Sequence, residues 1–223
     1  FCGLNENLIQ GYNGVKQYIS TPNPAYFKFS ADMDAKPYYN FIFGFDGRND
    51  VLRMLGVKYI LSKSESSISG YSYQQKVDDI NIYLANNYQG IGHVFHNYIT
   101  YDNFMSLSTT DKDLAFSRCT ILNNQQISEV KVEPVTIADC LARDSVLSDN
   151  SESFNLEVLN GRHVLGSVNL LSNGILYLAI PYDQGFSAKV DGKDVPVLNV
   201  SDGFVGLELT VGKHSIELDY FPP

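Results

Sequence analysis

Aromatic residues next to amide or carboxylate side chains are the feature of this sequence that comes closest to a binding chemistry. Three groups of this kind stand out, Tyr12-Asn13, Tyr38-Tyr39-Asn40 and Tyr182-Asp183. A tyrosine ring packs well against the C–H groups of a sugar, while a neighbouring amide or carboxylate binds the hydroxyls. These residues are therefore candidate glycan-binding residues. The alternative is that the tyrosines are half-buried packing residues and that the Asn and Asp residues form turns.

Two further groups have the residue types of a metal or acid/base site. Asp46 and Asp50 lie on either side of Gly47, and His93 and His96 are three residues apart. The two aspartates fit better at the N-terminus of a helix, where such residues cap free N–H groups and complement the dipole. The histidines lack the further ligands that a metal site needs. The sequence therefore predicts no metal site and no cofactor.

Motifs of nucleophilic and nucleotide chemistry are missing from the sequence. There is no G-x-S-x-G elbow, no P-loop and no dinucleotide glycine fingerprint. We therefore expect this chain to be non-catalytic by itself. The three cysteines, Cys2, Cys119 and Cys140, show no C-x-x-C spacing. Buried free thiols are expected, with a Cys119–Cys140 disulfide as the alternative.

Charge and hydropathy exclude two classes of function. The chain has 16 Lys and Arg against 25 Asp and Glu, which gives a net charge of −9. Nucleic-acid binding needs clustered basic residues, so we expect no nucleic-acid partner. The longest apolar run, residues 174–180, is far shorter than the roughly 20 residues that cross a bilayer, so the sequence predicts no membrane-spanning segment within residues 1–223.

The first part of the chain has mixed α and β patterns. Pro22 and Pro24 precede a predicted short helix, and Asn49 is a predicted N-cap for a helix that ends at Gly56. Residues 110–113 resemble a capping box before another helix. Strands are predicted at three places, and a serine-rich loop at one. The strands are 57–61 (buried), 80–84 and 130–133, and the loop is 62–72.

From residue 154 onward, apolar and polar residues alternate in four segments, which is typical of antiparallel strands with one buried face. Asp191-Gly192 predicts a type I′ hairpin, and residues 211–213 predict a second one. The sequence thus predicts a mainly β fold with an α+β N-terminal part and a C-terminal antiparallel β-sandwich. We place the domain boundary in the polar segment 144–153, between domains 1–150 and 151–223.

The order of several short motifs resembles the extracytoplasmic region of YfhO-family bacterial membrane proteins. The motifs run from about residue 5 to the end, with a gap near 125–170. The matching segments are 7–15 (NLIQGYNGV), 52–61 (LRMLGVKYIL), 82–104, 178–193 (with IPYDQGF and VDGK) and 203–220. Two positions depart from the pattern: Phe186 replaces the usual Trp, and Ile91-Gly92-His93 stands where a Pro is usual.

The resemblance implies membrane helices before Phe1 and after Pro223. It further implies that the chain itself lies on the extracytoplasmic side of a bacterial cell membrane. It also implies kinship with GT-C polyprenyl-phosphate-sugar glycosyltransferases, some of which modify teichoic-acid-type polymers. The implied partners are an envelope glycan or lipid-linked sugar and the attached transmembrane helices. The favoured hypothesis is a non-catalytic part of such an enzyme that assists glycosylation of envelope polymers. The alternatives are a carbohydrate-binding or adhesion module on another membrane anchor, and a free-standing hydrolase.

Overall fold

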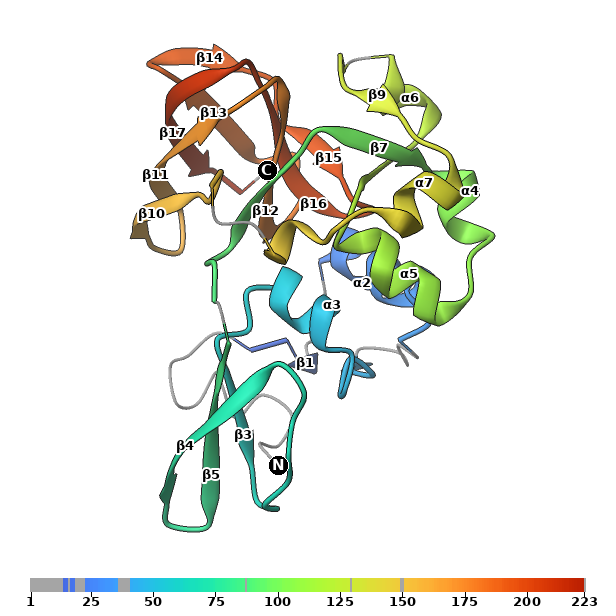
Figure 1. Ribbon diagram of the computed structural model, residues 1–223. Coiled ribbons are helices and arrows are strands. Elements are labelled where there is room, and N and C mark those ends of the chain that lie inside the picture. The colour runs from blue at the N-terminus through green and yellow to red at the C-terminus, as the bar shows by residue number, and fades with distance from the viewer. Residues whose placement is uncertain are drawn as a thin grey trace.

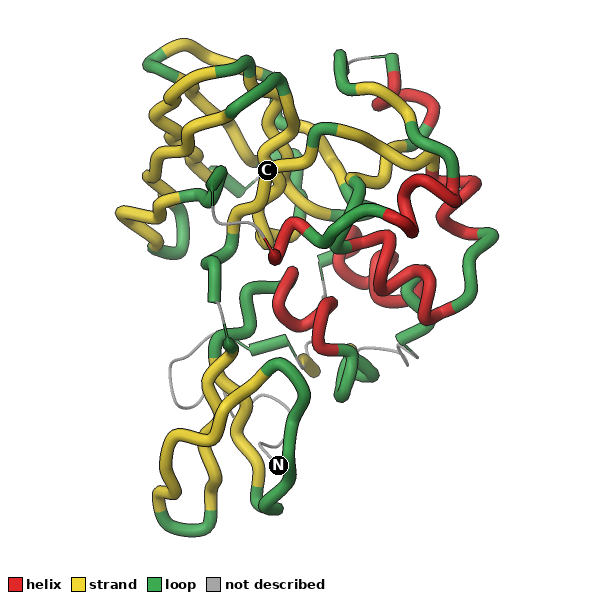
Figure 2. Tube along the Cα trace, in the orientation of Figure 1, coloured by secondary structure: helices red, strands yellow, loops and turns green. Residues whose placement is uncertain are grey.

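The computed structural model describes residues 14–15, 17–18, 23–35, 41–86, 88–128, 130–148 and 151–222. Strands predominate, and the described helices all lie between residues 24 and 148 (Figures 1 and 2). The C-terminal part consists of antiparallel strands. The predicted fold class, mainly β with an α+β N-terminal part and a C-terminal β-sandwich, is confirmed.

The helices are α2 (Pro24–Asp32), α3 (Asn49–Met54), α4 (Tyr101–Met105), α5 (Thr109–Phe116), α6 (Asn124–Ile127), α7 (Ile137–Ala142) and the 3-10 helix η1 (Val146–Ser148). The strands before residue 150 are β1 (Gln17–Tyr18), β2 (Phe41–Ile42), β3 (Tyr59–Ser62), β4 (Tyr71–Val77), β5 (Ile80–Ala85), β6 (Gly92–Phe95), β7 (Asn97–Thr100), β8 (Thr120–Leu122) and β9 (Glu133–Pro134). The later strands are β10 (Asn155–Leu159), β11 (His163–Leu170), β12 (Gly174–Pro181), β13 (Phe186–Val190), β14 (Lys193–Val195), β15 (Leu198–Val200), β16 (Phe204–Leu209) and β17 (Gly212–Tyr220).

Two antiparallel sheets form the β-sandwich. One has the strand order β10-β11-β17-β13-β14 and the other β15-β16-β12-β6. Alternate residues of both sheets fill the space between them, including Val164, Val168, Leu207 and Leu218. This is the burial that the alternating sequence segments predict.

The four-stranded sheet is covered on both faces, which explains the continuous apolar run in β12. Leu176 and Leu178 point into the sandwich core. Ile175 and Tyr177 point to the other side and join a second core formed with the helices. The Tyr177 ring lies 5.2 Å from the Phe204 ring in that core. A strand buried on both faces needs apolar residues at every position rather than at every second one.

Contacts between the two halves of the chain are extensive. Strand β6 pairs with β12 of the sandwich, with Phe95 opposite Ile175. The second core likewise combines residues from both sides of position 150, such as Phe29 and Phe204. The division into domains 1–150 and 151–223 stays a prediction. The contacts described here join residues on both sides of that boundary.

A small parallel sheet and several helices complete the N-terminal part. Its strand order is β8-β7-β9, and both pairings are parallel. A separate antiparallel sheet, β3-β5-β4, projects from the opposite end of the molecule to the sandwich (Figure 1). The parallel sheet is the element that positions the candidate site described below.

The predicted helices are present, but two begin at a different residue than expected. Helix α2 begins at Pro24, and Asn23 caps it by accepting a hydrogen bond from the backbone N–H of Tyr26. Asn49 is the first residue of α3 rather than its N-cap, because the chain enters the helix at Arg48 without any side-chain cap. Helix α5 begins one residue before the expected box, because Ser108 takes the capping role.

The predicted strands differ in detail. Strand β3 is half-exposed rather than buried, because it is an edge strand of the projecting sheet. Of residues 130–133, only Glu133 enters a strand. The Asp191-Gly192 hairpin is confirmed, with φ of 53° and 77° as a type I′ turn requires. The expected second hairpin at 211–213 is wrong, because β16 and β17 belong to different sheets.

Candidate functional site

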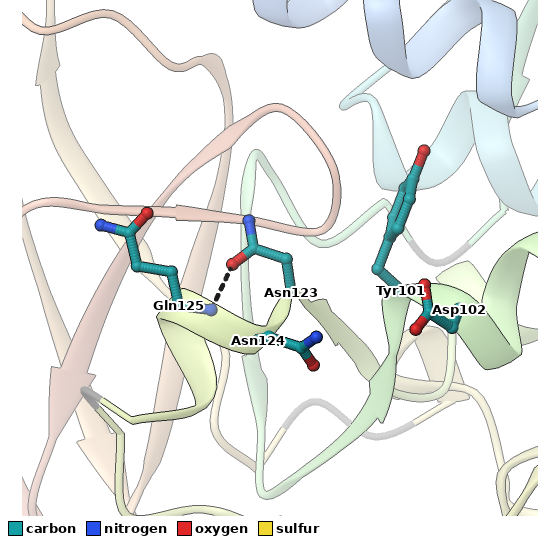
Figure 3. Close-up of a pocket in the computed structure, with 5 residues that line it drawn as sticks. All are labelled: Tyr101, Asp102, Asn123, Asn124 and Gln125. Atoms are coloured by element: carbon teal, nitrogen blue, oxygen red, sulfur yellow. Dashed lines mark hydrogen bonds between the residues drawn. The ribbon is translucent and has the colours of Figure 1, made fainter.

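The candidate site is a polar cavity at the carboxyl ends of β7 and β8. These parallel strands end side by side, with Thr100 opposite Leu122. A cavity of about 340 Å³ lies just beyond this edge (Figure 3). It is lined by the residues that follow the two strands: Tyr101, Asp102, Asn123, Asn124 and Gln125. Ligands of α/β proteins bind preferentially outside the carboxyl ends of parallel strands, where loops and helix starts bring polar groups together.

Local capping fixes this edge of the sheet. The Thr100 hydroxyl accepts a hydrogen bond from the Asn103 backbone N–H and so starts α4 directly after β7. Asn123 and Gln126 form a capping box that starts α6 directly after β8. The Gln126 amide also donates to the Asn199 carbonyl oxygen, which holds α6 against β15. The capping residues therefore leave little freedom in the walls of the cavity.

Three polar side chains of the cavity have no partner within the described part of the chain. Asp102, Asn124 and Gln125 make no side-chain hydrogen bond or ion pair with a described residue, and all three are exposed. By contrast, the Asn123 oxygen already accepts hydrogen bonds from the Gln125 and Gln126 backbone N–H groups. A ligand can thus be bound without breaking existing interactions of the first three side chains.

A second, smaller cavity adjoins the first. Its volume is about 140 Å³, and it shares Tyr101 and Asn123 with the larger one. Its other lining residues are Ala25, Lys28, Ile121, Gln126, Asn199, Asp202 and Gly203. The two cavities share lining residues and lie between α2, α4, α6 and the β15–β16 turn; together we call them the amide cleft.

One wall of the amide cleft is a charged cluster centred on Lys28. The Lys28 ammonium contacts the carboxylates of Asp32 and Asp202 and lies 3.1 Å from the Tyr101 hydroxyl. It also lies 4.3 Å from the centre of the Tyr101 ring. The Tyr101 hydroxyl donates to Asp32 Oδ2 over 2.8 Å. The side chain of Asp202 is only 5% exposed.

Asp202 and Asp32 are two carboxyl groups that contact the same lysine ammonium. Burial, together with the neighbouring carboxyl group of Asp32, raises the pKa of Asp202 to about 7. Burial opposes a lower pKa at Asp32, but hydrogen bonds from Asp202, Lys28 and Tyr101 bring its pKa below the usual value. Two adjacent carboxyl groups titrate as a unit in which one keeps its proton. Lys28 is therefore neutralised within its own cluster.

The turn that presents Asp202 has an unusual backbone. Ser201, Asp202 and Gly203 have φ of 48°, 63° and 147° in succession. The turn is held by hydrogen bonds from the Ser201 N–H to the Ile121 carbonyl and from the Tyr182 N–H to the Gly203 carbonyl, each 2.9 Å long. A Cβ atom at Gly203 would lie 2.6 Å from the Ala25 carbonyl oxygen, so the contact with α2 requires glycine. Backbone conformations of this kind are concentrated at functional sites.

The predicted glycan-binding residues contribute little to this cleft. Tyr12, Asn13, Tyr38, Tyr39 and Asn40 lie outside the described residues. Tyr182 and Asp183 lie near the turn at Gly203, but neither lines the two cavities. The Asp183 carboxylate accepts a hydrogen bond from the Gly185 N–H over 2.9 Å, as in an ordinary turn. The role of all these residues in glycan binding stays a prediction.

The residues of the amide cleft are not among the aromatic–polar pairs predicted from the sequence to bind glycans. Tyr101-Asp102 is a pair of the same kind as Tyr182-Asp183, and it follows a β-rich segment. Residues 123–126, Asn-Asn-Gln-Gln, are an amide-rich run directly after β8. Both groups are marked in the sequence by their position directly after a β-rich segment. No sequence motif around Lys28 or Asp202 indicates that they belong to a site.

A Ser–His–Glu arrangement elsewhere has the spacing of a catalytic relay but not its hydrogen-bond roles. Ser172 Oγ lies 3.0 Å from His96 Nδ1, and His96 Nε2 lies 2.7 Å from Glu152 Oε2. However, His96 Nδ1 also lies 2.9 Å from the Asn173 carbonyl oxygen. A carbonyl oxygen can only accept, so Nδ1 carries a proton on this side of the ring and has no lone pair to activate Ser172. His96 therefore acts as a brace between loops.

The other predicted candidates have structural roles. His93 is buried and stacks on Tyr177, while His96 pairs with Glu152, so the two histidines do not form a common site. In the described part of the chain, a different group, His163, Glu217 and Asp219, brings ligand atoms within 4.8 Å of one another on the outer face of the sandwich. Cys119 and Cys140 are buried free thiols.

The chain belongs to a family of bacterial membrane proteins. The family model described as "Bacterial membrane protein YfhO" matches residues 3–139 and 143–223, and the chain is therefore a member of the YfhO family. It is 27% identical to YfhO of Bacillus subtilis (strain 168) over 81 residues, which are 36% of this chain and 9% of that relative. No solved structure matches the chain. None of the described helices is both long and apolar enough to span a bilayer.

Proposed function

We propose that this chain is an extracytoplasmic part of a YfhO-family membrane protein and that its amide cleft binds a saccharide of the cell envelope. The observation that carries the proposal is a set of polar side chains without a partner among the described residues, Asp102, Asn124 and Gln125, gathered beside Tyr101 at the edge of a parallel sheet. Polar side chains held by rigid elements around a cavity are the usual arrangement of a small-ligand site.

The chemistry of the cleft suits a sugar better than other ligands. Each sugar hydroxyl both donates and accepts a hydrogen bond, and the amides of Asn124 and Gln125 can do the same. The carboxylate of Asp102 adds a strong acceptor. The ring of Tyr101 offers an apolar surface to C–H groups. An apolar ligand would leave these polar groups unpaired, which is costly.

The wider role we propose is assistance in glycosylating an envelope polymer. Family membership supports a membrane setting, and the resemblance to GT-C polyprenyl-phosphate-sugar glycosyltransferases suggests that the cleft holds the growing glycan. The matched segment spans only 9% of the Bacillus relative, so a catalytic centre would lie in other parts of the full-length protein. The alternative is a binding or adhesion module in a protein without transferase activity.

Saccharide binding is tested on the chain as it stands. Envelope-type oligosaccharides are titrated into the isotope-labelled chain, and NMR shift changes are followed. We expect changes at residues 101–102 and 123–125, and at least a tenfold loss of affinity in the double variant Asn124→Ala, Gln125→Ala, since two hydrogen bonds at about 1 kcal/mol each are lost. Gln75→Ala, an exposed change on β4, is the matched control. Shift changes confined to other surfaces would refute the proposed site.

The extracytoplasmic placement and the role in transfer need the full-length protein in cells. A cysteine introduced at Gln75 in place of the glutamine should react with a membrane-impermeant thiol reagent in intact cells, because that side chain is exposed. Protection until the cells are lysed would contradict the placement. Loss of polymer glycosylation in the Asn124→Ala, Gln125→Ala variant would support assistance in transfer, whereas unchanged glycosylation would favour the binding-module alternative.

A further inference from the structure

The described residues that line the amide cleft include a free carboxylate but no free cation. Asp102 is exposed and has no ion-pair partner among the described residues. Among the described residues that line the two cavities, Lys28 is the one cation. The chain as a whole has a net charge of −9, so the wider surface does not offset the negative charge of Asp102.

Lys28 is not available to an anionic ligand. Its ammonium contacts Asp32 and Asp202, and it could bind an anionic ligand only by breaking these ion pairs. Although burial lowers the pKa of Lys28, the hydrogen bonds from its ammonium to Asp202, Asp32 and Tyr101 raise it above the usual value. A phosphate brought into the cleft would face Asp102 and, among the described lining residues, would find no free cation.

We infer that the amide cleft selects saccharides with a free amine over their N-acetylated and phosphorylated counterparts, and that Asp102 binds the ammonium group. An ammonium at this wall would gain a charge-assisted hydrogen bond to Asp102 and could donate to the side-chain oxygens of Asn124 and Gln125. The Tyr101 ring already carries the Lys28 ammonium over one face, so Asp102 rather than the ring binds the ammonium of the ligand. N-acetylation removes the charge, and a phosphate group is repelled by Asp102.

This inference rests on the proposed saccharide binding and narrows its ligand class. The probes are a glucosamine trisaccharide, the N-acetylglucosamine trisaccharide of the same linkage, and a phosphate-bearing glucosamine, all titrated at about pH 6 where the amine is charged. We expect the amine form to bind about fivefold more tightly than the N-acetyl form at low salt, the upper range for an exposed ion pair. The preference should fall to about twofold in roughly 0.5 M salt because the charges are screened.

Asp102→Asn tests the assigned residue. The variant keeps the size of the side chain and should bind both trisaccharides with equal affinity. Glu157→Gln is the matched control: it removes the same charge from an exposed position on β10 and should keep the preference. Thermal unfolding of both variants checks that they fold, which we expect because neither side chain has an interaction within the described part of the chain.

The outcomes separate the inference from the proposed function. If the wild-type chain binds the two trisaccharides equally, or the phosphorylated sugar as tightly, amine selection is wrong and saccharide binding stands. A preference that survives Asp102→Asn would overturn the assignment of Asp102. If neither trisaccharide nor any envelope oligosaccharide binds, the proposed function itself fails.

Discussion

The buried histidine His93 should make the stability of the fold depend steeply on pH. Its side chain is 3% exposed, and its ring stacks on Tyr177 at a centre distance of 6.3 Å. Its Nε2 atom has no hydrogen-bond partner among the described residues. Burial, and to a smaller extent the nearby charge of Arg53, lowers the pKa of His93 from 6.5 to about 4. The folded state therefore holds this ring neutral.

The sign and size of the effect follow from linkage. Between pH 6.5 and about 4 the unfolded chain binds a proton at His93 that the folded chain does not, so stability falls as the pH falls through this window. Each pKa unit corresponds to about 1.4 kcal/mol, which gives a loss of roughly 3 kcal/mol at the acidic end. A loss of this size is a large fraction of the total stability of a typical domain, about 5–15 kcal/mol.

The prediction is tested by comparing the wild-type chain with His93→Leu in urea titrations from pH 7 to about pH 4. Leucine has a similar volume and no charge, so we expect a change below about 1.5 kcal/mol at pH 7. At the acidic end the variant should be relatively more stable, by roughly 3 kcal/mol. Using the difference between the two proteins cancels other titrating groups, such as Asp202, whose raised pKa acts in the opposite direction.

His163→Gln is the control for this experiment. His163 lies on the outer face of the sandwich, where its side chain is 30% exposed, and the variant retains His93. It should therefore keep the acid-sensitive component that His93→Leu loses. Parallel pH profiles for the wild-type chain and His93→Leu would refute the account, because the buried ring would then not be the source of the acid sensitivity.

Two further predictions concern packing and turn geometry. In thermal unfolding, Gly166→Ala should destabilise the fold by about 1–3 kcal/mol, because the new Cβ would lie 2.3 Å from Cζ of Phe154. Gly161→Ala is the control and should have little effect, because a Cβ at Gly161 would have no heavy atom within 4 Å. Asp191→Ala should cost roughly 1–2 kcal/mol, because it removes the acceptor for the Ser215 N–H and places alanine at positive φ. Asp191→Asn, which keeps both properties, should stay within about 0.5 kcal/mol, and equal losses in the two Asp191 variants would contradict this reasoning.

The strands of the sandwich could be predicted because their signal is local. A strand with one exposed and one buried face shows its period in five or six residues, as in 212–220. The same holds for the Asp191-Gly192 turn, whose positive φ values need these residue types. Helix starts were less certain, because Ser108 and residues 110–113 offer competing caps and the tertiary contacts decide between them.

Strand pairing could not be predicted from the same patterns. The alternation of β16 and β17 is equally consistent with a hairpin, yet the two strands lie in opposite sheets. Strand β6, residues 92–95, is buried throughout and pairs with β12 about 80 positions away. Alternation identifies which face of a strand is buried, but it contains no information on the neighbour that supplies the hydrogen bonds.

The amide cleft as a whole could not be predicted from local sequence patterns either, because its residues come together only in the folded chain. Its charged wall combines Lys28 on α2, Tyr101 at the start of α4 and Asp202 in the β15–β16 turn, residues that are separated by up to 174 positions along the chain. Only the three-dimensional fold brings a second carboxyl group to the lysine and so removes the charge that would attract phosphate. The turn at 201–203 has three consecutive positive φ values with one glycine among them, and the contacts with β8 and α2 that maintain it come from distant parts of the sequence. The preference for an amine is assigned to Asp102, so Lys28→Gln should leave it intact. A variant that frees Lys28 by removing both of its acidic partners should instead bring phosphate binding into the cleft.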